Sequence, residues 1–312
     1  STRKESSAAS DVYKRQECYE VLGTTLEAHS EQLDDIFDRL VHVRDRMARK
    51  MGYENFIELG YCRMERMCYD VQAVQTFREN IVRDIVPVVS RLRLENAKRL
   101  GIDTFRLYDN EVFTPGGDPT PCGKEALFAA AQKMYDGMGD VPGTFFRMMC
   151  QNEAFDVDAR PNKWGGGYCT EFVKYHQPFI LANFNGTSGD VDVVTHEAGH
   201  ALNAYLIANN RFALELGCGG METAETHSMS MEFFAWPYLD GFFPKAGDAQ
   251  RYRFQHALDA LSFLPYGTMV DEFQHRIYAE PDLTPAGRNA VWLELEAKYR
   301  PYICLLYTSD AA

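Results

Sequence analysis

Two histidines four positions apart are the strongest chemical signal in this sequence. His196 and His200 enclose Glu197 in the pentapeptide HEAGH, within the segment DVDVVTHEAGHALNAYLIA, whose apolar residues recur at helical spacing. At 3.6 residues per turn both imidazoles project from one face of a helix, where they can bind the same metal ion. A helix with this motif is typical of a zinc site that acts on a carbonyl group.

The chemistry that this motif predicts is hydrolysis. A zinc ion lowers the pKa of a bound water from 15.7 to about 7, and Glu197 can accept the proton of that zinc-bound water as it attacks the carbonyl. Glu197 can then pass the proton to the leaving amine. We therefore expect Glu197 to be catalytic and expect one Zn²⁺ per chain, held by His196, His200 and a third protein ligand, because a catalytic zinc keeps one position open.

The third ligand is expected on the next helix, in the segment METAETHSMSMEFFAWP. Its carboxylates belong to Glu222, Glu225 and Glu232, which share roughly one helical face. Apolar residues flank all three, and a carboxylate among such neighbours is costly to bury without a cation. His227, two positions after Glu225, is expected to point to another side of the helix. The residues alone leave open which carboxylate binds the metal.

The elements that must position these groups are predicted to be helices for the most part. Pro87 is expected to kink one of them and Pro265 to break another. Two short strands are predicted near 166–184, so the fold class is mainly α with a small β element beside the HEAGH helix. The predicted helices cover residues 25–49, 53–61, 70–100, 124–137, 144–153, 189–208, 221–236, 246–279 and 285–299.

Composition indicates an ordinary folded protein. Of the 312 residues 46% are apolar and 25% are charged, and the net charge of −13 argues against nucleic acid as a partner. The sequence has neither a run of 18 apolar residues nor a signal-peptide pattern, so we expect no membrane partner and a cytoplasmic location. The eight cysteines contain no CxxC pair and are expected to be reduced thiols.

The two ends of the chain are expected to be non-native. Residues 1–16 and 304–312 show no periodicity and resemble peptides translated from adapter sequence at the edges of assembled environmental reads. The remainder is predicted to comprise a helical wall region, 17–160, and a catalytic core, 161–303, each of them partial.

The segments HEAGH and AETHSMSMEF resemble the oligoendopeptidase F branch of the thimet oligopeptidase family. Residues 51–70, MGYENFIELGYCRMERMCYD, and residues 165–201 are similar to that branch as well, and the likeness spans nearly all of 17–303. The resemblance implies a helical, zincin-like catalytic domain from a larger helical peptidase with a deep cleft, truncated here at both ends. It implies a zinc metalloendopeptidase that hydrolyses internal bonds of short peptides.

The resemblance also implies roles for single residues. The family has a Glu-x6-Glu pair on the helix after HExxH. Glu225 is therefore expected to bind zinc, and Glu232 is expected to be a supporting or structural carboxylate that does not itself bind the metal. The strand PFILANF resembles one that pairs with an extended peptide, which makes Ala182, Asn183 and Phe184 candidate substrate contacts. An ordinary buried strand is an equal alternative for these three.

Some alternatives stay open at this point. Asp192, one turn before His196, is expected either to position the site or to cap the helix. His256 and His275 lie in helical segments without metal spacing and are expected to be structural. Co²⁺ or Mn²⁺ could occupy the same donor set.

Two alternative functions share features of this sequence. HEAGHA also occurs in membrane-bound ATP-dependent proteases, but these carry a GxxxxGK[ST] loop, and Lys124, in the single Gly-Lys pair here, is followed by Glu125. The second is a non-catalytic helical module that binds metal and peptide. In the family a His- and Tyr-containing segment that stabilises the oxyanion would follow LEAKYRPYI, where this chain continues as CLLYTSDAA. Without that segment the chain is expected to bind metal and peptide but to hydrolyse poorly, which is the reason for this alternative.

Overall fold

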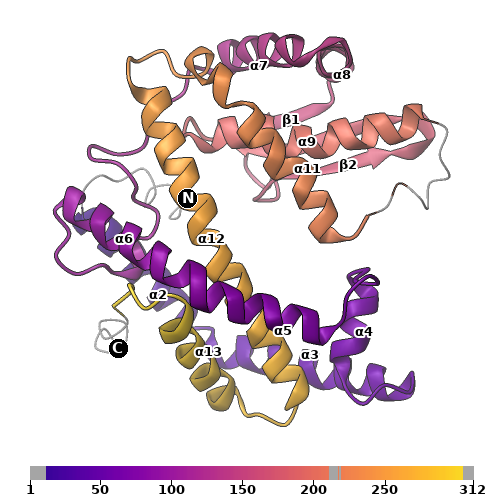
Figure 1. Ribbon diagram of the computed structural model, residues 1–312, viewed down its shortest axis with the longest axis vertical. Helices are drawn as coiled ribbons and strands as arrows, with labels where there is room; N and C mark the ends of the chain where they lie inside the picture. The colour runs from indigo at the N-terminus through magenta and orange to yellow at the C-terminus, as the bar shows by residue number, and fades with distance from the viewer. Residues whose placement is uncertain (1–11, 211–216, 218, 305–312) are drawn as a thin grey trace. The chain divides into compact units, whose positions relative to one another are not determined.

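The computed structural model describes residues 12–210, 217 and 219–304 (Figure 1). Most of the two predicted tails, 1–11 and 305–312, therefore lies outside the described residues. The first helix begins at Val12, inside the predicted tail 1–16, and Arg15 forms a buried ion pair with Asp109 at 2.8 Å. That these residues are non-native stays a prediction.

The chain forms two compact units. Unit 1 consists of residues 1–117 and 254–312, and unit 2 consists of residues 118–253. The division differs from the predicted boundary between 160 and 161, because the helices that follow residue 123 pack on the helix that carries HEAGH.

Unit 1 is helical. Side chains of Asn55, Asp70 and Thr284 accept hydrogen bonds from the first turns of three of its helices and so mark where those helices begin. Gly101, with φ of 72°, ends a fourth in the left-handed region. The elements are α2 (Val12–Glu27), α3 (Ser30–Lys50), α4 (Phe56–Arg63), α5 (Val71–Asn80), the π turn η1 (Ile81–Ile85), α6 (Val86–Leu100), the 3₁₀ turn η2 (Leu107–Asp109), most of α12 (Asp248–Ala279) and α13 (Pro285–Tyr299).

The two prolines behave differently. Pro87 lies in the first turn of α6, and the π turn η1 stands directly before that helix, where the sequence predicts a kink. The predicted break at Pro265 is wrong, since α12 continues through it. A proline removes one intrahelical hydrogen bond, here to the carbonyl of Leu261, and neighbouring turns can hold the helix together.

Unit 2 combines helices with a small sheet. The strand order is β1-β3-β2, with β1 parallel and β2 antiparallel to the middle strand. The sequence predicts two strands and misses the short β1. The elements are α7 (Lys124–Met138), α8 (Asp140–Gln151), β1 (Phe155–Asp158), β2 (Tyr168–Phe172), the 3₁₀ turn η3 (Val173–Tyr175), β3 (Gln177–Phe184), α9 (Gly189–Asn209), α11 (Met221–Phe234), the 3₁₀ turn η4 (Trp236–Gly241) and the first residues of α12.

The core of unit 2 holds α9 in place. Aromatic side chains of Tyr135, Phe145 and Phe146 are fully buried together with Ile180 and Val194. The Tyr135 hydroxyl donates a hydrogen bond of 3.0 Å to the carbonyl of Val194, two residues before the first histidine. The predicted fold class, mainly α with a small sheet beside the HEAGH helix, is confirmed. None of the helices in the described part of the chain is both long and apolar enough to cross a bilayer.

Candidate metal centre

The helix α9 presents both histidines of the HEAGH motif on one face. The ring centroids of His196 and His200 are 5.0 Å apart, and both rings are partly buried. The start of the helix is fixed by Asp190, whose carboxylate accepts hydrogen bonds of 2.9 and 2.8 Å from the backbone N–H groups of Asn185 and Gly186. This turn joins β3 directly to α9 and sets the direction in which the motif enters the core.

Glu225 on α11 meets both imidazoles. Its Oε2 atom lies 3.3 Å from Nε2 of His196, and its Oε1 atom lies 3.7 Å from Nε2 of His200. One donor atom from each of the three residues lies within 4.8 Å of the other two. Two donors of a tetrahedral zinc at about 2.0–2.1 Å are separated by roughly 3.4 Å, so these residues fit the ion in both donor type and spacing.

Glu232 fixes the orientation of the first imidazole. Its Oε1 atom lies 2.5 Å from Nδ1 of His196, which directs Nε2 of the same ring toward Glu225. Burial lowers the pKa of His196, but the hydrogen bond and charge of Glu232, with further carboxylates nearby, outweigh it and leave the pKa raised. A carboxylate behind a histidine is the usual support of a metal-binding imidazole.

A glycine allows α9 and α11 to cross at close range (Figure 1). A Cβ atom added to Gly199 would lie 2.8 Å from Cα of Ser228 and 3.1 Å from both the carbonyl oxygen of His227 and Cβ of Met231. Only a residue without a side chain fits there. The crossing places Glu225 and Glu232, which lie before and after Ser228 in the chain, against the histidines. Gly199 was not among the residues predicted from the sequence.

Ser228 was also not predicted from the sequence. Its side chain is fully buried, and its hydroxyl donates to Oε2 of Glu225 at 3.0 Å, with the carbonyl oxygen of the same residue at 3.2 Å. The hydroxyl thus restrains the carboxylate that faces the two imidazoles. A serine one turn after a candidate ligand, on the buried face of the helix, is the signal that could have revealed it.

Glu197 points toward the sheet. Its Oε1 atom lies 3.7 Å from the position that a Cβ atom on Gly167 would take, just before β2. Burial, followed by the charge of Glu225, raises the pKa of Glu197, while His196 and the backbone of Cys169 act in the opposite direction. Burial together with the charge of Glu197 raises the pKa of the Cys169 thiol to about 12, so this cysteine stays protonated.

The three predicted substrate contacts lie at the end of β3, which is the middle strand of the sheet. The Ala182 side chain is buried, and the Phe184 ring packs against Phe128 with centroids 6.1 Å apart. The Asn183 amide donates to the backbone carbonyls of Trp164 and Gly166, at 3.0 Å each. Their contact with substrate stays a prediction.

The sheet topology bears on how a peptide could pair with unit 2. Both edges of β3 are occupied around Ile180 and Leu181, by β1 on one side and β2 on the other. Within the described residues, β2 therefore supplies the open edge beside α9, and the sequence did not assign that edge to it.

The remaining candidates lie around this group. Asp192 accepts a hydrogen bond from the hydroxyl of Tyr252. Its part in positioning the site stays a prediction. Glu222 is exposed and lies outside the group of three donors, as does His227, which is half-buried. The structure thus brings together His196, His200 and Glu225, with Glu232 behind the first histidine.

Comparison with known proteins identifies the family. The model of peptidase family M3 matches residues 141–310. Oligopeptidase PepF of Bacillus subtilis (strain 168) is 24% identical over 234 residues. Among solved structures, PZ peptidase A with an inhibitor superimposes with a TM-score of 0.92 at 39% identity, over 99% of this chain. A protein described as an oligoendopeptidase F from Bacillus anthracis gives 0.89 at 39% identity, also over 99% of this chain.

These relatives are longer than the chain. It spans 34% of the Bacillus subtilis oligopeptidase, 56% of PZ peptidase A and 57% of the Bacillus anthracis protein. The family match covers more than half of the chain and includes α9 and α11, and the likeness in structure extends over nearly all of it. The chain belongs to peptidase family M3, in the oligoendopeptidase F branch.

Proposed function

We propose that the chain carries the zinc centre of a metalloendopeptidase that hydrolyses internal bonds of short peptides. The observation that supports this most directly is the approach of Glu225 to both imidazoles, at 3.3 and 3.7 Å, next to the Glu197 carboxylate. One Zn²⁺ per chain would be held by His196, His200 and Glu225. When bound, the ion polarises the scissile carbonyl and makes water acidic enough to be deprotonated near neutral pH.

The chain's own residues divide the remaining work. Glu197 accepts the proton from the attacking water at its carboxylate and delivers it to the leaving amine, for which a raised pKa is favourable. Glu232 keeps Nε2 of His196 directed at the metal position, and Ser228 does the same for Glu225. The metal-binding set is thus held by hydrogen bonds within the helix pair α9–α11.

The sheet supplies a way to orient the peptide. We infer that an extended substrate adds to the open edge of β2, because no other strand of the described residues pairs with that side and the Glu197 carboxylate lies beside Gly167. Gly165 to Gly167 precede the strand and leave the backbone accessible. Asn183 holds the carbonyl of Gly166 and so shapes this approach from β3.

Metal stoichiometry tests the ligand set. We expect one zinc per chain in the 312-residue protein and in Glu222→Ala, and loss of zinc in Glu225→Ala. Retention of zinc in Glu225→Ala would contradict the assignment. Wild-type protein that binds zinc and peptide without turnover would support the non-catalytic module instead.

A further inference from the structure

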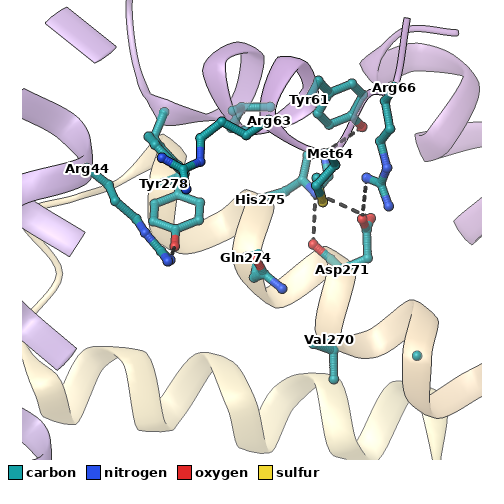
Figure 2. Close-up of a pocket in the computed structure, with 14 residues that line it drawn as sticks. Arg44, Tyr61, Arg63, Met64, Arg66, Val270, Asp271, Gln274, His275 and Tyr278 are labelled. Carbon is teal, nitrogen blue, oxygen red and sulfur yellow. Dashed lines mark hydrogen bonds and ion pairs between the residues drawn. The ribbon is translucent and has the colours of Figure 1, made fainter. Parts of the chain in front are cut away.

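Unit 1 contains a pocket that the proposed function does not use. It has a volume of about 390 Å³ and lies between α3, α4 with the turn after it, and the part of α12 from Gly267 to Tyr278 (Figure 2). Pockets of this size accommodate small organic molecules. All its lining residues belong to unit 1, whereas the metal centre belongs to unit 2.

The charge of the pocket is positive. Asp271 is the single carboxylate in its lining, and Arg66 and Arg78 compensate its charge with contacts of 3.0 and 2.8 Å. Arg44 and Arg63 also line the pocket, and neither forms an ion pair with a carboxylate of the described residues. Two guanidinium groups without acidic partners are notable in a chain whose net charge is −13.

The histidine of the lining adds no charge. His275 shares a hydrogen bond of 2.9 Å with the hydroxyl of Tyr61, and its other ring nitrogen lies 2.8 Å from the backbone oxygen of Asp271. Burial lowers the pKa of His275, with Arg78 and Arg66 acting in the same direction, so the ring is neutral at pH 7. The excess positive charge therefore resides on Arg44 and Arg63.

Aromatic rings form the apolar wall and hold one of these cations. The rings of Phe56 and Tyr278 meet edge to face at 4.9 Å. The guanidinium carbon of Arg44 lies 5.4 and 5.8 Å from their centroids, and Arg44 donates a hydrogen bond to the Tyr278 hydroxyl. Figure 2 shows Arg44 and Arg63 on the same side of the pocket as Tyr278. A guanidinium spread over rings keeps further N–H groups for a planar anion.

We propose that this pocket binds a small organic carboxylate that carries a flat apolar group, with the carboxylate at Arg44 and Arg63 and the apolar group against Phe56, Met64 and Tyr278. A carboxylate matches the planar guanidinium fork, and the aromatic wall matches a ring. The C-terminal residue of a short peptide and a free aromatic acid share this chemistry. The proposal goes beyond the peptidase function and does not depend on it.

Calorimetry with N-acetylphenylalanine tests the site. The 312-residue protein is freed of metal with a chelator, so that the carboxylate cannot bind a metal ion in unit 2. We expect one bound molecule per chain, with binding about tenfold weaker for the neutral amide of the same compound and for Arg63→Met. Arg91→Met, which removes an exposed arginine of α6 outside the pocket, is the matched control and should bind like wild type.

Several outcomes would overturn the proposal. They are absence of binding at millimolar probe, equal affinity for acid and amide, and equal affinity in Arg63→Met and Arg91→Met. Inorganic phosphate binding more tightly than the probe would assign the pocket to phosphate instead. Arg63 is exposed and forms no ion pair with the described residues, so its substitution should leave the fold intact, which thermal unfolding verifies. Phenylpropanoate, which lacks the amide, distinguishes the sources: equal affinity indicates a free acid, and weaker binding indicates a peptide end.

Discussion

The proposed metal centre of unit 2 and the pocket of unit 1 are assembled in opposite ways. The candidate donors come from two helices that are neighbours in the sequence, and together with Glu232 they lie between residues 196 and 232. The pocket joins residues 44–66 to residues 267–278, which are some two hundred positions apart. A site built within one helix pair leaves a spacing pattern that can be read, whereas a site between distant segments leaves none.

The largest expected effect concerns the proposed metal centre, at the general base Glu197. Glu197→Gln keeps the shape of the side chain but cannot accept a proton, so peptide hydrolysis should fall by about 10²–10⁴-fold. Zinc content should stay that of wild type, because this residue is outside the donor group. The measurement is turnover of an internally quenched short peptide, with zinc determined on the same samples. Turnover that survives the substitution would contradict the general-base role.

The second prediction concerns the helix crossing. In Gly199→Ala the new Cβ would lie 2.8 Å from Cα of Ser228, which separates α9 from α11 and moves Glu225 away from the histidines. We expect zinc affinity to fall by more than tenfold and the free energy of unfolding to fall by about 1–3 kcal/mol. Competition with a chromophoric chelator and chemical denaturation measure the two effects.

Gly23→Ala is the matched control for that substitution. Outside its own helix backbone, no atom of the described residues lies within 4 Å of a Cβ atom placed at Gly23 in α2, so alanine there should raise the free energy of unfolding by about 0.5–1 kcal/mol and leave zinc binding unchanged. Similar effects of the two substitutions would show that the helix crossing is not what Gly199 provides.

The third prediction separates positioning from packing in α11. Ser228→Ala removes the hydroxyl that donates to Oε2 of Glu225 and should weaken zinc binding about 10–100-fold. Ser230→Ala on the same helix, a serine that makes no hydrogen bond to Glu225 among the described residues, should bind zinc as wild type does. If both variants bound zinc equally, the hydrogen bond of Ser228 would be structural only.

Particular residues show how far the sequence could be read. Helical spacing sufficed for α9 and α11, because the apolar residues of the first and the carboxylates of the second recur at helical intervals. Periodicity could not distinguish Glu225 from Glu222, and the expectation of Glu225 came from the family resemblance; the crossing at Gly199 explains in physical terms why Glu225 meets the histidines. The strand β1 was missed because its four residues are too few to show a periodic pattern. The middle position of β3 could not be predicted, because it depends on pairing with strands that lie elsewhere in the chain. His275 was expected to be structural; it shares a hydrogen bond with Tyr61 and also lines the pocket of unit 1.

The smallest expected effect is a pH dependence in unit 1. Burial would raise the pKa of Glu272, but hydrogen bonds from Lys298 and Tyr299 outweigh it and leave the pKa lowered. A carboxyl whose pKa is lower in the folded state stabilises the fold above its unfolded pKa, and this stabilisation is lost as the pH falls through the folded value.

We therefore expect wild type to lose slightly more stability than Glu272→Gln on acidification below about pH 4.5, by less than about 1 kcal/mol, since the groups are partly exposed. Chemical denaturation of both proteins across that range measures the difference. Equal losses would mean that the hydrogen bonds of Lys298 and Tyr299 do not favour the charged carboxylate. Loss of zinc or turnover in Glu272→Gln at neutral pH would show instead that this residue contributes to the function of unit 2, against the contrast drawn between the two regions.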